Sequence, residues 1–226
     1  MKISLLVTIG CMILCEAGGV VWASEVTHKD RIFAVVQKMV SALEGMDDFI
    51  SETEVIYYDK GKEKQRYQLT YFFKKGGYFR INFSRPFPGL TAFYKRGDEK
   101  LTAKPFRYLP LTFHFSIHNR LVRTPSGQRI DQADVRYLIE FLLKNNKWIE
   151  EKDSEFSEEG EEVTFLFWAK DYLAGETFER YRVSVSSKNW LPMQVERYAS
   201  GGTPIETAIF KKYTINPHLK DSFFLP

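Results

Sequence analysis

Short alternating segments separated by tight turns dominate the chain from Phe49 to Phe106. Five of them are rich in β-branched and aromatic residues: FISETEVIYY, RYQLTYFF, YFRINF, LTAFY and KLTAKPF. The turn signals DKGKEK, KKGG, RPFPG and RGDE lie between them. Because such short connections join neighbours that run in opposite directions, this region predicts an antiparallel sheet.

A second group of strands is predicted nearer the C-terminus. The segments VTFLFWAK, FERYRVSVS, LPMQVERY and IETAIFKKYTI have the same character, and ASGG (199–202) predicts a hairpin between the last two. The acidic stretch 150–162 predicts a loop with a weak strand, and PLTFHFSIHNRLV (110–122) alternates as an extended segment. PSGQR (125–129) is interpreted as an ordinary turn.

Two segments have helical periodicity. HKDRIFAVVQKMVSALEGM (28–46) repeats apolar residues at the spacing of one helical face, and Gly45 is expected to end it. DQADVRYLIEFLLKNNKW (131–148) has Asp131 as its expected N-cap. The inner stripe of this second helix consists of Val135, Leu138, Ile139 and Leu142.

The predicted elements define an α+β fold class. A long antiparallel sheet curls because its twist accumulates, and each helix has one apolar stripe to bury. We therefore expect a strongly curved antiparallel sheet, an incomplete β-barrel, with helices covering its concave apolar face. No linker divides the chain, so residues 24–226 are expected to form a single domain.

Alternation along the strands assigns an apolar face rich in phenylalanine, because a residue and its second neighbour point to the same side. With the stripe of the second helix, the residues expected to face the interior are Leu69, Tyr71, Phe73, Phe79, Ile81, Phe83, Val135, Leu138, Ile139, Leu142, Phe165, Phe167, Val183 and Val195. Met193 is expected to align with Val195. Periodicity leaves two interpretations open, since a filled core and a ligand cavity have the same residue types.

The N-terminus has the features of an export signal. Lys2 precedes the apolar stretch ISLLVTIGCMILC (3–15), which is too short to span a bilayer, and VWA (21–23) places small residues at a cleavage site. Cleavage is expected after Ala23, which predicts a periplasmic protein. The alternative is a lipoprotein signal with Cys11 as the lipidated residue, to which TIGC is a poor match.

Composition argues against several classes of function. Both cysteines lie inside the predicted signal, so the mature chain is expected to have no disulfide and no catalytic thiolate. A net charge of +3 is mild for a nucleic-acid binder, so no nucleic-acid partner is expected. The sequence has no G-x-S-x-G elbow, Walker loop or dinucleotide fingerprint, and we expect neither enzymatic activity nor a cofactor.

A metal site at His114 and His118 is also not expected. Four residues of an extended segment span about 13 Å, which is too far for both imidazoles to bind one ion. The acidic pairs Asp47–Asp48 and Glu161–Glu162 are interpreted as solvated turn residues rather than as catalytic dyads.

Two long segments carry a resemblance to a known superfamily. YFFKKGGYFRINFSRPFPGLTAFYKRGDEKLTAKP (71–105) resembles the superfamily of the periplasmic lipoprotein carrier LolA, in its strand, basic residue, tight turn, aromatic strand, proline and following hairpin. LPMQVERYASGGTPIETAIFKKYTINPHLKDSFFLP (191–226) is similar to the C-terminal end of that family. The resemblance implies an incomplete barrel with helices as a lid over a cavity that takes the acyl chains of lipoproteins.

The resemblance also implies residue roles and partners. Carried over by position, the lid-locking arginine of the family falls on Lys75, which lacks the planar fork of donors of an arginine, and the aromatic residue after it falls on Phe79. The implied partners are an acylated lipoprotein or lipid, an inner-membrane release complex and an outer-membrane acceptor, with the carrier as a monomer. A carrier of another envelope lipid and a non-enzymatic sensory or regulatory binding protein stay open as alternatives.

Overall fold

The computed structural model describes residues 26–106, 111–132, 134–146, 149, 153–170 and 177–226. The first group of strands comprises β1 (Asp48–Asp59), β2 (Lys62–Lys74), β3 (Tyr78–Arg85), β4 (Thr91–Lys95), β5 (Lys100–Lys104) and β6 (Phe113–Ser116). The second group comprises β7 (Glu155–Glu159), β8 (Glu162–Lys170), β9 (Phe178–Ser186), β10 (Pro192–Tyr198) and β11 (Pro204–Ile215). The helices are α1 (His28–Glu44) and α2 (Val135–Asn145), with single 3-10 turns η1 (Arg120–Val122), η2 (Ile130–Gln132) and η5 (Asp221–Phe224).

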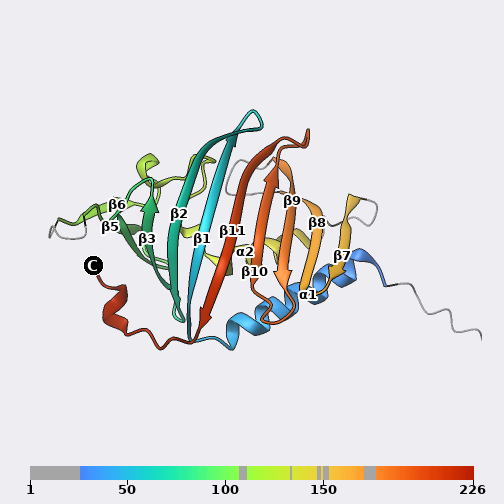
Figure 1. Cartoon of the computed structure of the whole chain (residues 1–226), viewed down its shortest axis with the longest axis horizontal. Helices are drawn as coiled ribbons and strands as arrows, with labels where there is room; N and C mark the ends of the chain where they lie inside the picture. The colour runs from blue at the N-terminus through green and yellow to red at the C-terminus, as the bar shows by residue number, and fades with distance from the viewer. Residues whose placement is uncertain (1–25, 107–110, 133, 147–148, 150–152, 171–176) are drawn as a thin grey trace, which may run out of the picture.

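Within the described residues, all the strands belong to one 11-stranded antiparallel sheet (Figure 1). Its order is β6-β5-β4-β3-β2-β1-β11-β10-β9-β8-β7, so β6 and β7 are the two edges and the sheet is not closed. The central strand β1 pairs with both β2 and β11, which joins the two groups of strands. The prediction of a large, open antiparallel sheet with two helices is therefore confirmed.

The turn between β2 and β3 shows why glycine is required there. Gly77 has φ +84°, and a Cβ at this position would lie 2.7 Å from the Cβ of Arg96. The backbone N–H of Arg96 donates to the carbonyl oxygen of Gly77 at 2.8 Å, so the β4–β5 turn lies directly against this one. Any side chain at Gly77 would force the two turns apart.

The ends of the helices differ partly from the predictions. Gly45 caps the end of α1 as predicted, and Thr27 begins that helix through a capping box. Asp131 is not the cap of the second helix, because it lies in η2. Asp134 has that role, since its side chain accepts a hydrogen bond from the N–H of Arg136 at 3.1 Å. Lys147 and Trp148, at the predicted end of the helix, lie outside the described residues.

Two predicted extended segments are interrupted. In the described part of the first segment, 111–122, only β6 is a strand, and η1 follows it, where the side chain of Asn119 accepts a hydrogen bond from the N–H of Leu121 at 2.9 Å. In β10 the pairing with β9 shifts between Pro192 and Gln194. This bulge breaks the alternation, so Met193 does not align with Val195 and is 38% exposed.

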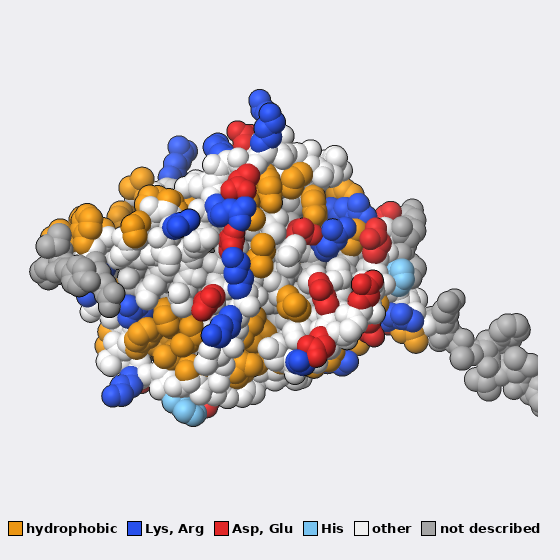
Figure 2. All heavy atoms as spheres, viewed as in Figure 1, with side chains coloured by type: hydrophobic (Ala, Val, Ile, Leu, Met, Phe, Trp, Pro, Cys, Tyr) orange, Lys and Arg blue, Asp and Glu red, His pale blue; other side chains and the backbone are white. Residues whose placement is uncertain are grey.

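Between these and the other register shifts of the sheet, the strands alternate between an inner and an outer face. Side chains of the inner face join those of α1 and α2 in one apolar core, which includes Phe49, Phe165 and Ile32. The outer face has ion pairs instead, such as those of Glu54 with Arg66 and Lys211, and charged side chains cross it in Figure 2. Both helices lie on the side of the sheet away from this charged face (Figure 1).

Candidate ligand-binding cavity

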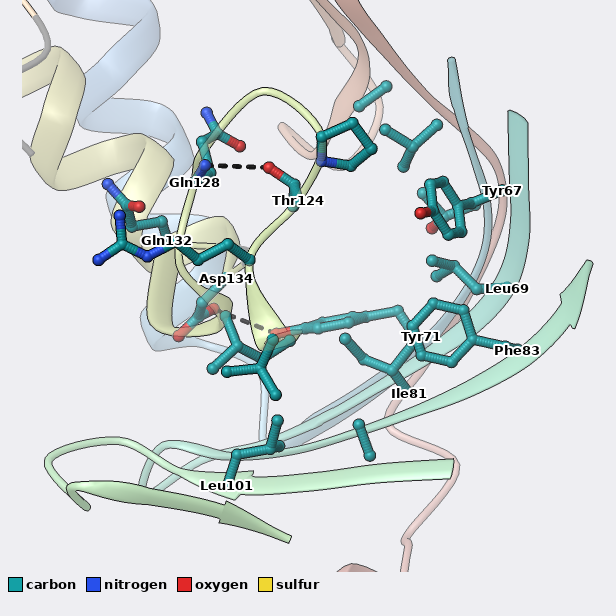
Figure 3. Close-up of a pocket in the computed structure, with 18 of the residues that line it drawn as sticks. Tyr67, Leu69, Tyr71, Ile81, Phe83, Leu101, Thr124, Gln128, Gln132 and Asp134 are labelled. Atoms are coloured by element: carbon teal, nitrogen blue, oxygen red, sulfur yellow. Dashed lines mark hydrogen bonds between the residues drawn. The ribbon is translucent and has the colours of Figure 1, made fainter. Parts of the chain in front are cut away.

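An apolar cavity with a volume of about 580 Å³ lies between the inner face of the sheet, α2 and the loop that precedes α2 (Figure 3). Side chains of β1, β2, β3, β10 and β11 form one wall, and Val135, Leu138 and Phe141 of α2 form part of the other. This volume is in the range of sites that bind small molecules. The interior of the sheet is therefore only partly filled by protein.

Half of the apolar site residues predicted from the sequence line this cavity. These are Leu69, Tyr71, Ile81, Phe83, Val135, Leu138 and Val195. The others are buried in the packed core and do not line it: Phe73, Phe79, Ile139, Leu142, Phe165, Phe167 and Val183. A role of the first group in ligand binding stays a prediction.

Both groups belong to one apolar core or pack against it, and Ile32, Val36 and Met39 of α1 are part of the same core. Strand alternation assigns a residue to a face, but it does not say where along that face the packing leaves space. The cavity lies where this core is incompletely filled.

Lys75 lies at the end of α1 and does not line the cavity. Its Nζ donates a hydrogen bond to the carbonyl oxygen of Glu44 at 2.9 Å, and its backbone N–H donates to the carbonyl oxygen of Asp47 at 2.7 Å. A cation near the C-terminus of a helix interacts favourably with the helix dipole. Lys75 therefore ties the turn after β2 to the last turn of α1 through a single side-chain bond.

The helix α2 is attached to the sheet at both ends. At its start, the hydroxyl of Tyr71 donates to Oδ1 of Asp134 at 3.4 Å (Figure 3). At its end, Asn145 is completely buried and its Oδ1 accepts a hydrogen bond from the N–H of Lys170 at 2.8 Å. An ion pair between Arg96 and Glu140 at 2.6 Å adds a contact on the exposed side. These contacts hold the cavity-facing side of α2 in place.

The environment at the start of α2 disfavours charge. Burial raises the pKa of Tyr71 well above its ordinary value. Burial also raises the pKa of Asp134, although the N–H and the charge of Arg136 act in the opposite direction. A site of low polarity suits a neutral hydrocarbon ligand better than a charged one.

A short segment that we call the strap (Arg123–Arg129) closes one end of the cavity. It turns on itself, since the N–H of Gln128 donates to Oγ1 of Thr124 at 3.0 Å (Figure 3). The hydroxyl of Ser126 donates to Oε2 of Glu206 on β11 at 2.5 Å. Glu206 in turn lies 3.9 Å from the guanidinium of Arg197, which forms a buried ion pair with Glu179. A small polar cluster thus holds the strap against the sheet.

Sequence reasoning did not find the strap as part of the site. The sequence of 125–129 predicts an ordinary turn, and this part of the strap does form a turn, but one that lies against the cavity. Cavity residues outside the strands and α-helices, such as Phe87 after β3 and Leu121 in η1, follow no strand or helix periodicity. The only available signal was the position of this turn directly before an amphipathic helix.

The two histidines considered as metal ligands lie apart from the cavity. Nδ1 of His114 on β6 is 3.0 Å from Oγ1 of Thr102 on β5, and His118 is exposed beyond the end of β6. Within the described ranges, no group of three or more His, Cys, Asp or Glu side chains is placed to hold a metal ion. No helix in the same ranges combines the length and the apolar character needed to cross a membrane.

The chain is similar to known proteins in its structure, but the comparisons of its sequence found no match. No family model matches the chain, and no curated protein sequence matches it. An uncharacterized conserved protein from Thermus thermophilus is 7% identical, with a TM-score of 0.50 over 86% of this chain and 92% of that one, and it shows a shared fold. A LolA superfamily protein from Nitrosomonas europaea has 12% identity, coverage of 89% and 99%, and a TM-score of 0.44. The lipoprotein LppX from Mycobacterium tuberculosis has 8% identity, coverage of 84% and 97%, and a TM-score of 0.47.

The observed architecture can be compared with the one expected from the sequence. An open antiparallel sheet with two helices is the arrangement that the resemblance to the LolA superfamily implies, and the structure has this arrangement. At these identities the similarity concerns the fold alone.

Proposed function

We propose that this protein is a periplasmic binding protein whose cavity takes the acyl chains of a lipoprotein or another envelope lipid, and that it catalyses no reaction. The single observation that carries this proposal is the apolar cavity of about 580 Å³ between the sheet and α2. Each buried methylene group contributes about 0.8 kcal/mol, so apolar contact alone can hold a chain. Transfer of a lipoprotein to the outer membrane is the finer form of the proposal, and it rests on the resemblance in sequence.

In this proposal residues 24–226 act as one monomeric domain after cleavage behind Ala23. The two helices cover the concave face of the sheet, and the strap is the part that opens. A cargo protein or lipid would be received from an inner-membrane release complex and passed to an outer-membrane acceptor. A lid that closes over the empty cavity competes with the ligand, which keeps the affinity moderate and allows release.

A cavity-filling variant with a matched control tests the proposal. Ala208 on β11 lines the cavity, whereas the next residue, Ile209, points to the outer face. We expect Ala208→Trp to lower the affinity for a fluorescent fatty acid by about tenfold or more, because the indole occupies the space of the chain. Ile209→Trp should bind like the wild type, and both variants should keep the circular dichroism of a folded sheet. Equal binding by folded Ala208→Trp and wild type would place the ligand elsewhere.

A further inference from the structure

Large apolar side chains are exposed where the cavity reaches the surface. Leu121 is 80% exposed, Phe87 and Phe113 are each 48% exposed, and all three also line the cavity. Phe106 and Leu111, just outside β5 and β6, are 54% and 48% exposed. We call these five residues the entrance rim. Hydrophobic side chains gather at the β5–β6 edge of the molecule in Figure 2.

The charge around the entrance rim is positive. From Lys100 to Ile130 the sequence has six lysine or arginine residues and no aspartate or glutamate. Arg85 lies two residues before Phe87, Arg120 is the first residue of η1, and Arg123 follows η1 directly. All three arginines are exposed, and within the described part of the chain none of them forms an ion pair with a carboxylate.

The opposite edge of the sheet is acidic. The strand β7 and its turn to β8 carry exposed glutamates, among them Glu158, Glu159 and Glu162. Because β6 and β7 are the two edges of the sheet, positive and negative charge are separated across the molecule. Such a distribution orients a protein as it approaches a charged surface.

We propose that the entrance rim docks on a membrane surface that contains anionic lipid headgroups. The phenylalanine and leucine side chains enter the boundary of the acyl region, and Arg85, Arg120 and Arg123 contact headgroup phosphates. Arginines that form no ion pair within the described residues, around an apolar rim, fit phosphates directly, whereas the apolar residues alone would equally fit a groove on a protein. The inference rests on the proposed function in one respect. Docking places the opening of the cavity against the acyl chains of the membrane, from which a cavity that takes acyl chains could be filled.

Vesicle flotation with the chain from Ser24 tests this inference. The vesicles contain either phosphatidylcholine alone or phosphatidylcholine with phosphatidylglycerol. Two double variants, Phe106→Ser/Leu111→Ser and Arg85→Gln/Arg120→Gln, change the rim and its charge without touching the residues that line the cavity. The matched controls, Val26→Ser/Leu225→Ser and Lys212→Gln/Lys220→Gln, change exposed residues in other parts of the molecule.

We expect the wild type and both controls to float with the anionic vesicles and to bind the neutral ones more weakly. The arginine variant should bind the anionic vesicles about fivefold more weakly for each charge removed. The apolar variant should lose binding as well. Equal binding to both kinds of vesicle, or unchanged binding by the rim variants, would overturn the inference. Absence of vesicle binding would also overturn it and would assign the rim to a protein partner.

A fatty-acid binding assay on the same samples separates this inference from the proposed function. If vesicle binding fails while the fluorescent fatty acid still binds, only the docking surface is wrong. If vesicle binding follows the predicted pattern while the fatty acid does not bind, only the proposed function is wrong.

Discussion

The hydroxyl group of Tyr71 lies 3.4 Å from Oδ1 of Asp134, where the inner face of β2 meets the first turn of α2. Two residues further along β2, Phe73 is completely buried in the core. Two residues before Tyr71, Leu69 lines the cavity. The start of α2 is therefore attached to the sheet at the place where the packed core ends and the cavity begins.

The first prediction concerns Asp134 and pH. Asp134→Asn should keep the helix cap, because asparagine caps as well as aspartate, while it removes a buried carboxyl. Burial raises the pKa of Asp134 in the folded protein, so its contribution to stability is greatest below the pKa of the unfolded chain and is lost as the pH rises through the folded pKa. Relative to Asp134→Asn, the wild type should gain stability between pH 7 and about pH 4. Urea unfolding at both pH values checks this, and a constant difference would contradict it.

The second prediction compares two leucines one turn apart on α2. Leu142 is 1% exposed in the core, whereas Leu138 lines the cavity. Leu142→Ala should cost about 2–5 kcal/mol in the free energy of unfolding. Leu138→Ala should cost only about 1 kcal/mol, because part of its surface already faces empty space. Chemical denaturation of both variants measures the difference, and equal losses would mean that the cavity is filled.

The third prediction concerns the strap. Ser126→Ala removes the hydrogen bond from Ser126 to the carboxylate of Glu206. A hydrogen bond to a charged acceptor contributes about 1.5–3 kcal/mol. If the strap must open before a chain can enter, the variant should exchange a fluorescent fatty acid about tenfold faster in both directions. Stopped-flow fluorescence measures these rates, with Ser222→Ala in the C-terminal turn as the control. Unchanged rates would show that the ligand enters without movement of the strap.

The fourth prediction concerns Lys75. Its side chain is exposed and makes one bond to the last turn of α1, so Lys75→Met should lower the free energy of unfolding by about 1 kcal/mol or less. Lys75→Arg should restore most of this loss, because it keeps a cation beside the carbonyl group of Glu44. Thermal unfolding compares the three proteins. A loss as large as that of a core residue would mean that Lys75 has a much larger role in holding α1.

The sequence predicts the sheet well because its face alternation is strong. Tyr71 and Phe73 do share one face, and the division into two groups of strands agrees with the structure. What alternation could not supply is where the shared core leaves space, so that Ile81 lines the cavity whereas Phe79, two residues away on the same face, does not.

The sequence pattern also does not predict the local irregularities of the structure, namely the 3-10 turn before α2, the bulge in β10 and the place of the strap. Asp131 and Asp134 are both acceptable helix caps by composition, and only the intervening 3-10 turn selects the second. The bulge at Met193 has no signal in a strand that alternates well on either side of it. The strap had the composition of a turn, but its position over the cavity depends on its contact with Glu206, which is 80 residues away in the sequence.

The most direct test of the central claim is native mass spectrometry of the chain from Ser24, purified from the periplasmic fraction in which the proposed function places it, with Ala208→Trp alongside. We predict that the wild type carries an additional mass that lipid extraction identifies as an acylated peptide or another lipid, and that Ala208→Trp lacks it. An unliganded wild type that also fails to take up added fatty acid would contradict the claim that this cavity holds acyl chains.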